Sequence, residues 1–134
     1  MTNNTTPTLV KDVMWTQVDI VDSKCTVQNA LNDMQHKKTK MLLVDKSHEY
    51  DEYGVVLIAD IASKVIAKDR ALDRVNVYEI MNKPVISVRP DMDIRYCARL
   101  LTNFGLSRCP VLDNEKIIGM VSLTSIVFNG LRVV

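Results

Sequence analysis

The sequence predicts an α/β (α+β) fold of two pseudo-symmetric units, each a small β-sheet with flanking helices, packed sheet against sheet. One observation is a duplication: the short helical segment that ends at Met14 recurs in the segment that ends at Met81, a shift of 67 positions (81 − 14). A second observation is that helical stripes and strand-length apolar runs follow in the same order in both copies. A repeat this long that occurs only twice is not a solenoid, which needs more copies to be stable.

Composition agrees with one globular domain. A chain of 134 residues, 47% apolar and 25% charged, can bury a single substantial core. The net charge of +1, with basic and acidic side chains interspersed, gives no reason to expect nucleic acid or an acidic membrane as a partner. Because no apolar run could span a membrane and residues 1–7 have no signal-peptide core, we expect a cytoplasmic protein.

The repeat sets the expected domain boundaries. We expect a disordered N-terminal tail over residues 1–8, a first unit over 9–68, a linker over 69–76 and a second unit over 77–130. The linker is assigned because residues 69–76 are charged and carry no apolar stripe. Neither copy should fold alone, because each would leave one face of its sheet uncovered.

The first copy should contain a helix over 9–14 and strands over 18–21, 41–44 and 54–59. Thr26 is suited to cap the helix that follows the first strand. That helix carries one apolar stripe, formed by Val27, Ala30, Leu31 and Met34. Asp60 is expected to open the last helix, with Ile61, Val65 and Ile66 facing inward. The polar loop over 46–53 should be solvated and mobile.

The second copy repeats this order. We expect a helix over 77–81, a strand over 85–88 and a longer helix over 94–104, capped by Asp93 and ended by Gly105. Two strands over 108–112 and 117–121 should flank a tight turn. A final helix is expected over 123–130.

Catalytic and metal-binding residues are not expected. The sequence has an odd number of cysteines, and their spacing matches no zinc or disulfide framework: they are Cys25, Cys97 and Cys109. This favours free, mostly buried thiols in a reducing compartment. His36 and His48 are isolated in the sequence. No nucleophile has a neighbouring base and no glycine loop suits a phosphate, so an enzyme is the least favoured class.

These features resemble a tandem pair of cystathionine-β-synthase (CBS) domains, also called a Bateman module. The resemblance spans residues 9–129 and rests on motifs that recur in order. They are the Val-x-x-Ile/Val-Met segments, the Pro-Val-Leu-Asp run at 110–113 and the Gly-x-Val-Ser/Leu-x-x-Asp/Ser segments at 54–60 and 119–125. The resemblance implies a stand-alone regulatory or sensory module that acts on a separate, unknown protein.

The resemblance also implies that an adenine nucleotide or a related adenosyl ligand binds in the cleft between the two units. AMP, ADP, ATP and S-adenosylmethionine are candidate ligands, and no cofactor is required. In the family pattern a strand-end glycine lets the backbone approach the ligand, and a hydroxyl and a carboxylate follow at a helix start. The residues at these positions, with two basic residues placed to reach a phosphate, are Gly54, Asp60, Gly119, Ser122, Ser125, Lys40 and Arg108.

Each copy departs from that pattern at one position. The first has Leu57 where the hydroxyl belongs, and the second has Ser125 where the carboxylate belongs. Asp60 is therefore the one residue that matches the ribose-binding carboxylate of the family pattern. The cleft that contains Asp60 is the better candidate for the ligand-binding site.

Simpler roles compete with this assignment. Asp60, Ser122 and Ser125 suit helix caps, and Lys40 and Arg108 suit solvated charges at strand edges. The alternative function is therefore a ligand-free module for dimerisation or protein interaction.

The resemblance further implies a homodimer formed through the helices that flank each sheet. Here those helices are 27–37, 61–68, 94–104 and 123–130. Their apolar stripes are wider than one small core can bury, which leaves Phe104, Ile126 and Phe128 as candidate contacts.

Overall fold

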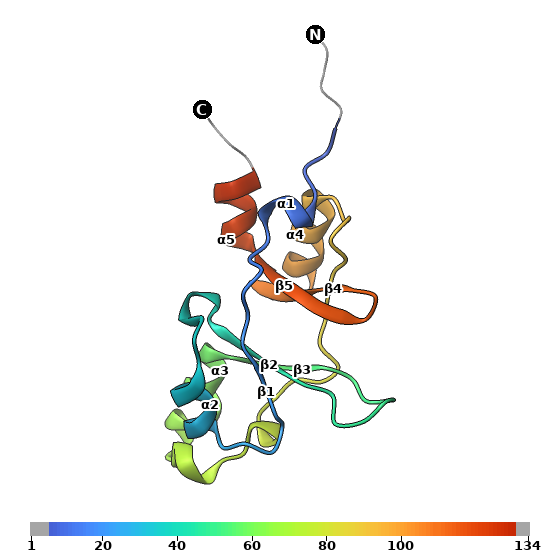
Figure 1. Ribbon diagram of the computed structural model, residues 1–134. Helices are drawn as coiled ribbons and strands as arrows, with labels where there is room; N and C mark the ends of the chain where they lie inside the picture. The colour runs from blue at the N-terminus through green and yellow to red at the C-terminus, as the bar shows by residue number, and fades with distance from the viewer. Residues whose placement is uncertain (1–5, 131–134) are drawn as a thin grey trace. The chain divides into compact units, whose positions relative to one another are not determined.

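The computed structural model describes residues 6–130 and divides into two compact units (Figure 1). One unit is Val18–Val85, and the other joins Met1–Gln17 to Ile86–Val134. Both combine helices with a small sheet, as the sequence predicts for an α+β fold of two units. Of the expected tail, residues 1–5 lie outside the described residues, and the carbonyl of Thr8 accepts a hydrogen bond from the Ile94 amide at 3.0 Å.

The Val18–Val85 unit is built on a three-stranded sheet in the order β1 (Ile20–Val21), β2 (Met41–Val44) and β3 (Gly54–Leu57). β1 runs parallel to β2, and β3 runs antiparallel to it, with Met41 opposite Leu57. Every residue of β2 is buried. That burial explains the unbroken apolar run, since a strand covered on both faces has no solvent side to mark with polar residues.

The helix α2 (Val27–Asp33) connects β1 to β2 and begins as predicted. The Thr26 hydroxyl accepts a hydrogen bond from the Asn29 amide at 3.1 Å, which satisfies one of the free amides of the first turn. Val27, Ala30 and Met34 are buried and Leu31 packs against the same core, so the predicted stripe is confirmed.

The helix α3 (Ile58–Lys64) differs from the prediction at both ends. It begins at Ile58, so Asp60 is its third residue and not its first. Ile61 and Val65 are buried, but Ile66 is 59% exposed, so its predicted inward position is wrong. The reason is that the helical period is broken after Val65, where a 3-10 turn, η2 (Ile66–Lys68), begins.

Residues 69–76 do more than connect the two copies. They contain the 3-10 turn η3 (Leu72–Arg74), and Val75 is buried in the core of the Val18–Val85 unit. The Val75 carbonyl accepts a hydrogen bond from the Val27 amide at 2.8 Å. A short turn can bury a single side chain without an apolar stripe, so periodicity gave no sign of this contact. The predicted helix over 77–81 is the 3-10 turn η4 (Val77–Glu79).

The other unit contains α1 (Val10–Val13), α4 (Ile94–Asn103), the hairpin of β4 (Arg108–Asp113) and β5 (Lys116–Ser122), α5 (Leu123–Ser125) and the π-helical turn η5 (Ile126–Gly130). Gly105 ends α4 with a φ of +65°, as expected of a glycine after a helix. The predicted strand over 85–88 is reduced to one parallel bridge between Val88 and Val111.

The opening segments of the two repeats are exchanged between the compact units. Trp15, from the first repeat, exchanges two backbone hydrogen bonds of 2.8 and 2.9 Å with Met120 on β5. Asn82, from the second repeat, exchanges two bonds of 2.9 Å with Val55 on β3. The compact units therefore do not share the boundaries of the sequence repeats.

The loop over residues 46–53 is solvated at its tip, where Tyr50 is 85% exposed, but a carboxylate fixes its base. Asp51 accepts hydrogen bonds from the amide and the hydroxyl of Ser47, both at 2.8 Å, and forms an ion pair with Lys83. The Lys83 ammonium and the Ser47 donors hold the pKa of Asp51 far below its usual value. Lys46 lies over the ring of Tyr53, 4.9 Å from its centre.

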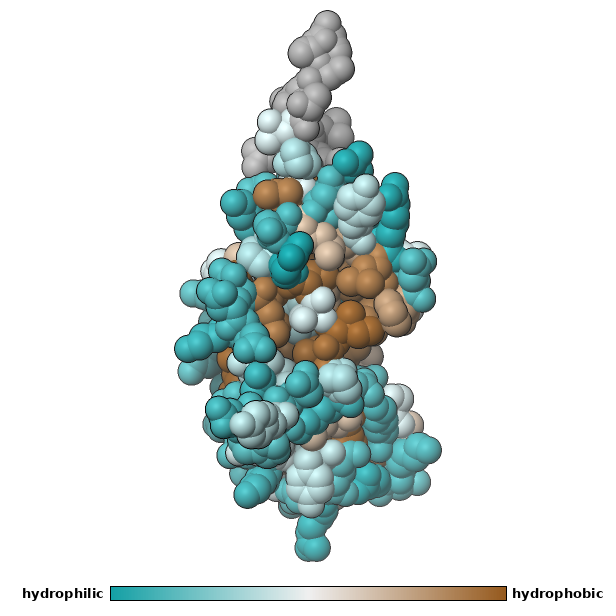
Figure 2. Space-filling view, turned by 90° about the vertical axis from the view of Figure 1, so that its right-hand side faces the viewer, coloured by the Kyte–Doolittle hydropathy of each residue, from teal (hydrophilic) through white to brown (hydrophobic). Residues whose placement is uncertain are grey.

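Large apolar side chains remain exposed in the unit that contains α4 and η5. Phe104 and Phe128 are 59% and 77% exposed, as expected for candidate contacts, whereas Ile126 is buried and the expectation for it is wrong. Ile126 packs into the core cluster of this unit. On the face drawn in Figure 2, brown apolar surface gathers in one patch among teal hydrophilic residues. The exposed Phe104 and Phe128 side chains remain candidates for a contact site.

Candidate functional site

Both motif glycines lie where another part of the chain packs closely against them, and the approach is much closer at Gly119 than at Gly54. A Cβ at Gly119 would lie 2.2 Å from the carbonyl oxygen of Trp15, and one at Gly54 would lie 3.0 Å from the sulfur of Met81. The glycines were expected to let a ligand approach the backbone closely. In the structure, the opening segments of the repeats already occupy that space beside each glycine. A bound ligand is not needed to explain either glycine.

Asp60 lies at the start of α3, directly after β3. Its Oδ2 accepts a hydrogen bond from the Leu57 amide at 3.4 Å, a long contact. Its Oδ1 has no hydrogen bond among the described residues. The carboxylate is half-buried, so it caps the helix weakly and keeps acceptor capacity for another donor.

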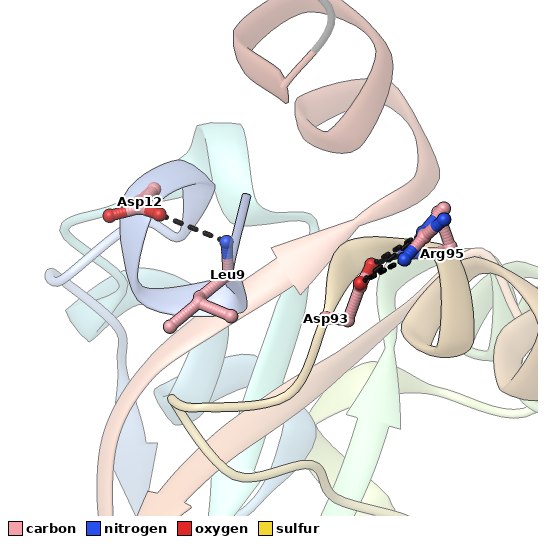
Figure 3. Close-up of polar contacts among 4 residues, drawn as sticks. All are labelled: Leu9, Asp12, Asp93 and Arg95. Atoms are coloured by element: carbon pink, nitrogen blue, oxygen red, sulfur yellow. Dashed lines mark hydrogen bonds and ion pairs between the residues drawn. The ribbon is translucent and has the colours of Figure 1, made fainter. Parts of the chain in front are cut away.

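Asp12 provides a comparison, because it is also the third residue of its helix. Its Oδ2 accepts a hydrogen bond from the Leu9 amide at 2.9 Å (Figure 3). Figure 3 also shows Asp93 facing Arg95, whose guanidinium holds the pKa of that carboxyl below its usual value. The contact of Asp12 is therefore shorter than the 3.4 Å contact of Asp60, and Asp93 is held by an ion pair with Arg95.

The matching position in the second copy is satisfied internally. The Ser122 hydroxyl accepts a hydrogen bond from the Ser125 amide, and the Ser125 hydroxyl accepts one from the Ser122 amide, both at 3.0 Å. The Ser125 hydroxyl also donates to the Ser122 carbonyl at 2.9 Å. Both serines are 4% exposed. This pair forms a capping box, so its polar groups need no ligand.

The basic residues lie beside the starts of the corresponding helices. The carbonyl of Lys40 accepts a hydrogen bond from the Ile58 amide at 3.0 Å, which fixes the backbone of Lys40 next to the first residue of α3, and the Lys40 side chain is exposed. Arg108 pairs with Ser122 across β4 and β5, and partial burial lowers the pKa of its guanidinium. Of the predicted site residues, the Val18–Val85 unit contains Gly54, Asp60 and Lys40, and the other unit contains Arg108, Gly119, Ser122 and Ser125.

The cysteines are free thiols, as predicted from their spacing. Cys97 and Cys109 are buried in the same core cluster. Interaction with the Cys97 thiol and burial raise the pKa of the Cys109 thiol, and burial also raises the pKa of the Cys25 thiol. Over residues 6–130 we find neither a cluster of three metal-ligating side chains nor a helix that is long and apolar enough to cross a membrane.

The chain belongs to the CBS domain family. The model of that family matches twice, over residues 10–67 and 77–131, which is most of the chain. The protein is therefore a tandem CBS domain pair, as the duplicated motifs predict.

Two curated relatives are longer proteins. The chain is 29% identical to the protein MK0525 of Methanopyrus kandleri over 105 residues, which are 78% of this chain and 53% of that protein. It is 34% identical to a homoserine O-acetyltransferase of Methanosalsum zhilinae over 113 residues, which are 84% of this chain and 22% of that enzyme. The chain thus spans about half of the first relative and about a fifth of the second.

Solved structures confirm the fold. The hexameric CBS-CP12 protein from bloom-forming cyanobacteria superposes with a TM-score of 0.87 and 33% identity, over 93% of this chain and 73% of that chain. The CBS domain pair of the protein MJ0100, solved with 5′-methylthioadenosine and S-adenosyl-L-methionine, superposes with a TM-score of 0.75. That pair is 24% identical over 93% of this chain and 98% of its own.

Proposed function

We propose that this chain is a non-catalytic regulatory module that binds an adenine nucleotide or a related adenosyl ligand through Asp60. The observation that carries the proposal is the weak capping contact of Asp60, which leaves one carboxylate oxygen without a hydrogen bond among the described residues. A ribose offers neighbouring hydroxyl donors, and hydrogen bonds from them to a charged carboxylate are among the stronger ones in proteins.

Lys40 is proposed as the phosphate contact, because its backbone is tied to the first residue of the helix that carries Asp60. Arg108 is a second candidate, proposed from its equivalent place in the other repeat. The inter-copy cleft is proposed as the binding position on the family resemblance. The complex of the MJ0100 pair with 5′-methylthioadenosine and S-adenosyl-L-methionine adds these compounds to the set to be tested.

Asp60→Ala is expected to weaken binding of the best adenosyl compound by about 10- to 100-fold, because a charged hydrogen-bond acceptor is lost. Calorimetry should compare it with Asp12→Ala, which removes a carboxylate of the same helix position in the other unit. Asp12→Ala should bind like the wild type. Equal heats for Asp60→Ala and the wild type would place the ligand elsewhere.

The complementary variant restores the missing hydroxyl. Leu57→Thr should tighten binding about three- to tenfold, the value of one added hydrogen bond. If no adenosyl compound gives heat with either the wild type or Leu57→Thr, the alternative function of a ligand-free interaction module is favoured.

We also propose a cytoplasmic homodimer in which Phe104 and Phe128 contribute to the contact. Support comes from their exposure, since large apolar side chains left exposed on one unit are candidates for an interface. Light scattering at micromolar concentration should give about twice the chain mass of 15.2 kDa. Phe104→Ser with Phe128→Ser should shift the mass toward the monomer, while Tyr50→Ser, at the exposed loop tip, should not. A monomeric wild type would contradict the proposal.

A further inference from the structure

A cavity in the Val18–Val85 unit lies away from the start of α3. It has a volume of about 290 Å³ and is lined by the end of β1 and by the residues that follow β1 and β2. Because β1 and β2 are parallel, with Val21 opposite Val44, their carboxyl ends meet at one edge of the sheet. β3 runs the other way, so Asp60 and Lys40 lie at the opposite edge. The carboxyl end of a parallel pair joined by a helix is a common place for a small-molecule site.

The walls of this cavity carry two charges of each sign. Asp22 and Lys24 follow β1, and Asp45 and Lys46 follow β2. The described ion pairs lie elsewhere: they join Arg70 to Glu79, Lys83 to Asp51, Arg89 to Asp91 and Arg95 to Asp93. The four charges at the cavity are thus not neutralised by ion pairs within the described residues.

Local hydrogen bonds hold the two carboxylates at the cavity and leave them acceptor capacity. The Oδ1 of Asp22 accepts from the Lys24 amide, and the Oδ1 of Asp45 accepts from the Lys46 amide, both at 2.8 Å. The second oxygen of each carboxylate has no hydrogen bond among the described residues. The Lys46 ammonium lies over the ring of Tyr53, and this contact restricts the Lys46 side chain.

The paired charges select the class of ligand. A simple anion would face two carboxylates, and a simple cation would face two ammonium groups, so each would meet repulsion as well as attraction. A small zwitterion offers an ammonium to the aspartates and a carboxylate to the lysines. Ile20, which is 47% exposed, gives the same cavity an apolar wall.

We propose that this cavity binds a zwitterionic α-amino acid, with its ammonium at Asp22 and Asp45 and its carboxylate at Lys24 and Lys46. The second repeat lacks this arrangement. Its equivalent segments read Arg-Pro-Asp at 89–91 and Asp-Asn-Glu at 113–115, and there Arg89 is paired with Asp91. The site is independent of the adenosyl site and does not rest on it.

The test is calorimetry of the full chain with each of the twenty L-amino acids. The best one is then compared with the carboxylic acid that lacks its ammonium and with the amine that lacks its carboxylate. The amino acid should bind, and both analogues should bind at least about tenfold more weakly, because each loses a charged pair of contacts.

Matched variants locate the site. Asp22→Asn and Asp45→Asn should each weaken binding at least about tenfold, while Asp113→Asn, at the equivalent place after the second hairpin strand, should leave it unchanged. Both exposed aspartates can be replaced without loss of the fold, because an asparagine oxygen still accepts the lysine amide. Asp60→Ala should not alter amino-acid binding, and Asp45→Asn should not alter adenosyl binding, which separates the two proposals.

Three results would overturn the proposal. The first is no binding of any amino acid up to about 10 mM. The second is binding that Asp45→Asn and Asp113→Asn affect equally. The third is a response to inorganic phosphate or to Mg²⁺ alone that is lost in Asp45→Asn, which would assign the cavity to a simple ion.

Discussion

Gly119→Ala is expected to lower the free energy of unfolding by about 3 kcal/mol, because an added methyl group meets backbone that cannot rotate away. The new Cβ would lie 2.2 Å from the carbonyl oxygen of Trp15. Relief of that contact requires Trp15 to move off β5, which breaks its two hydrogen bonds with Met120. Urea unfolding followed by fluorescence of Trp15, the single tryptophan, measures the loss.

Gly54→Ala is the matched control, because Gly54 holds the equivalent position in the first repeat. Its Cβ would lie 3.0 Å from the sulfur of Met81, at the flexible end of a side chain that can adjust, and 3.3 Å from the Asn82 carbonyl oxygen, a much milder backbone contact than that at Gly119. We expect a loss below about 1 kcal/mol. If Gly54→Ala lowers the free energy of unfolding as much as Gly119→Ala does, the clash with the Trp15 backbone is not the cause of the loss at Gly119.

A fragment of residues 18–85 is expected to unfold cooperatively, whereas a fragment of equal length, residues 3–70, is expected not to fold. The first keeps the whole core cluster of its compact unit. The second lacks Val75, Val77 and Ile80, which are buried in that cluster. Their burial is worth about 1.5–3 kcal/mol each, which together rivals the total stability of a small domain.

Backbone hydrogen bonds also favour folding of the 18–85 fragment over the 3–70 fragment. The 3–70 fragment also loses the hydrogen bonds that Val75 and Asn82 make with Val27 and Val55. Circular dichroism during urea unfolding distinguishes the fragments: a sigmoidal transition is expected only for 18–85, with a low midpoint because so small a core is marginal. Cooperative unfolding of 3–70 as a monomer would mean that the repeat, and not the compact unit, is the folding unit.

Local patterns predicted the elements with strong periodicity or clear caps. The stripe from Val27 to Met34 and the Thr26 cap appear as expected, as does the Gly105 stop of α4. Val75 escaped prediction, because a single buried side chain in a charged segment has no period to detect. Ile66 was misplaced, because the helical period was extended past the residue at which the helix ends.

The candidate site was predictable only as a list of residues. The motif named Asp60, but its weak contact with the Leu57 amide depends on where α3 begins. The cavity at the ends of β1 and β2 was missed in the sequence, although Asp-Ser-Lys at 22–24 and Asp-Lys-Ser at 45–47 stand after the two strands. Similar triads after two strands become a signal only once the strands are known to be parallel neighbours.

The sequence by itself determined the duplication, the CBS family and most helices and strands, because these depend on residue spacing along the chain. Only the tertiary structure decided which segments share a core. It placed Trp15 on the strand of Gly119 and Asn82 on that of Gly54, so the glycines serve contacts between distant parts of the chain. Hydrophobic burial stabilises any apolar segment that packs well into a core, whatever its distance along the sequence. The compact units therefore need not have the same boundaries as the sequence repeats.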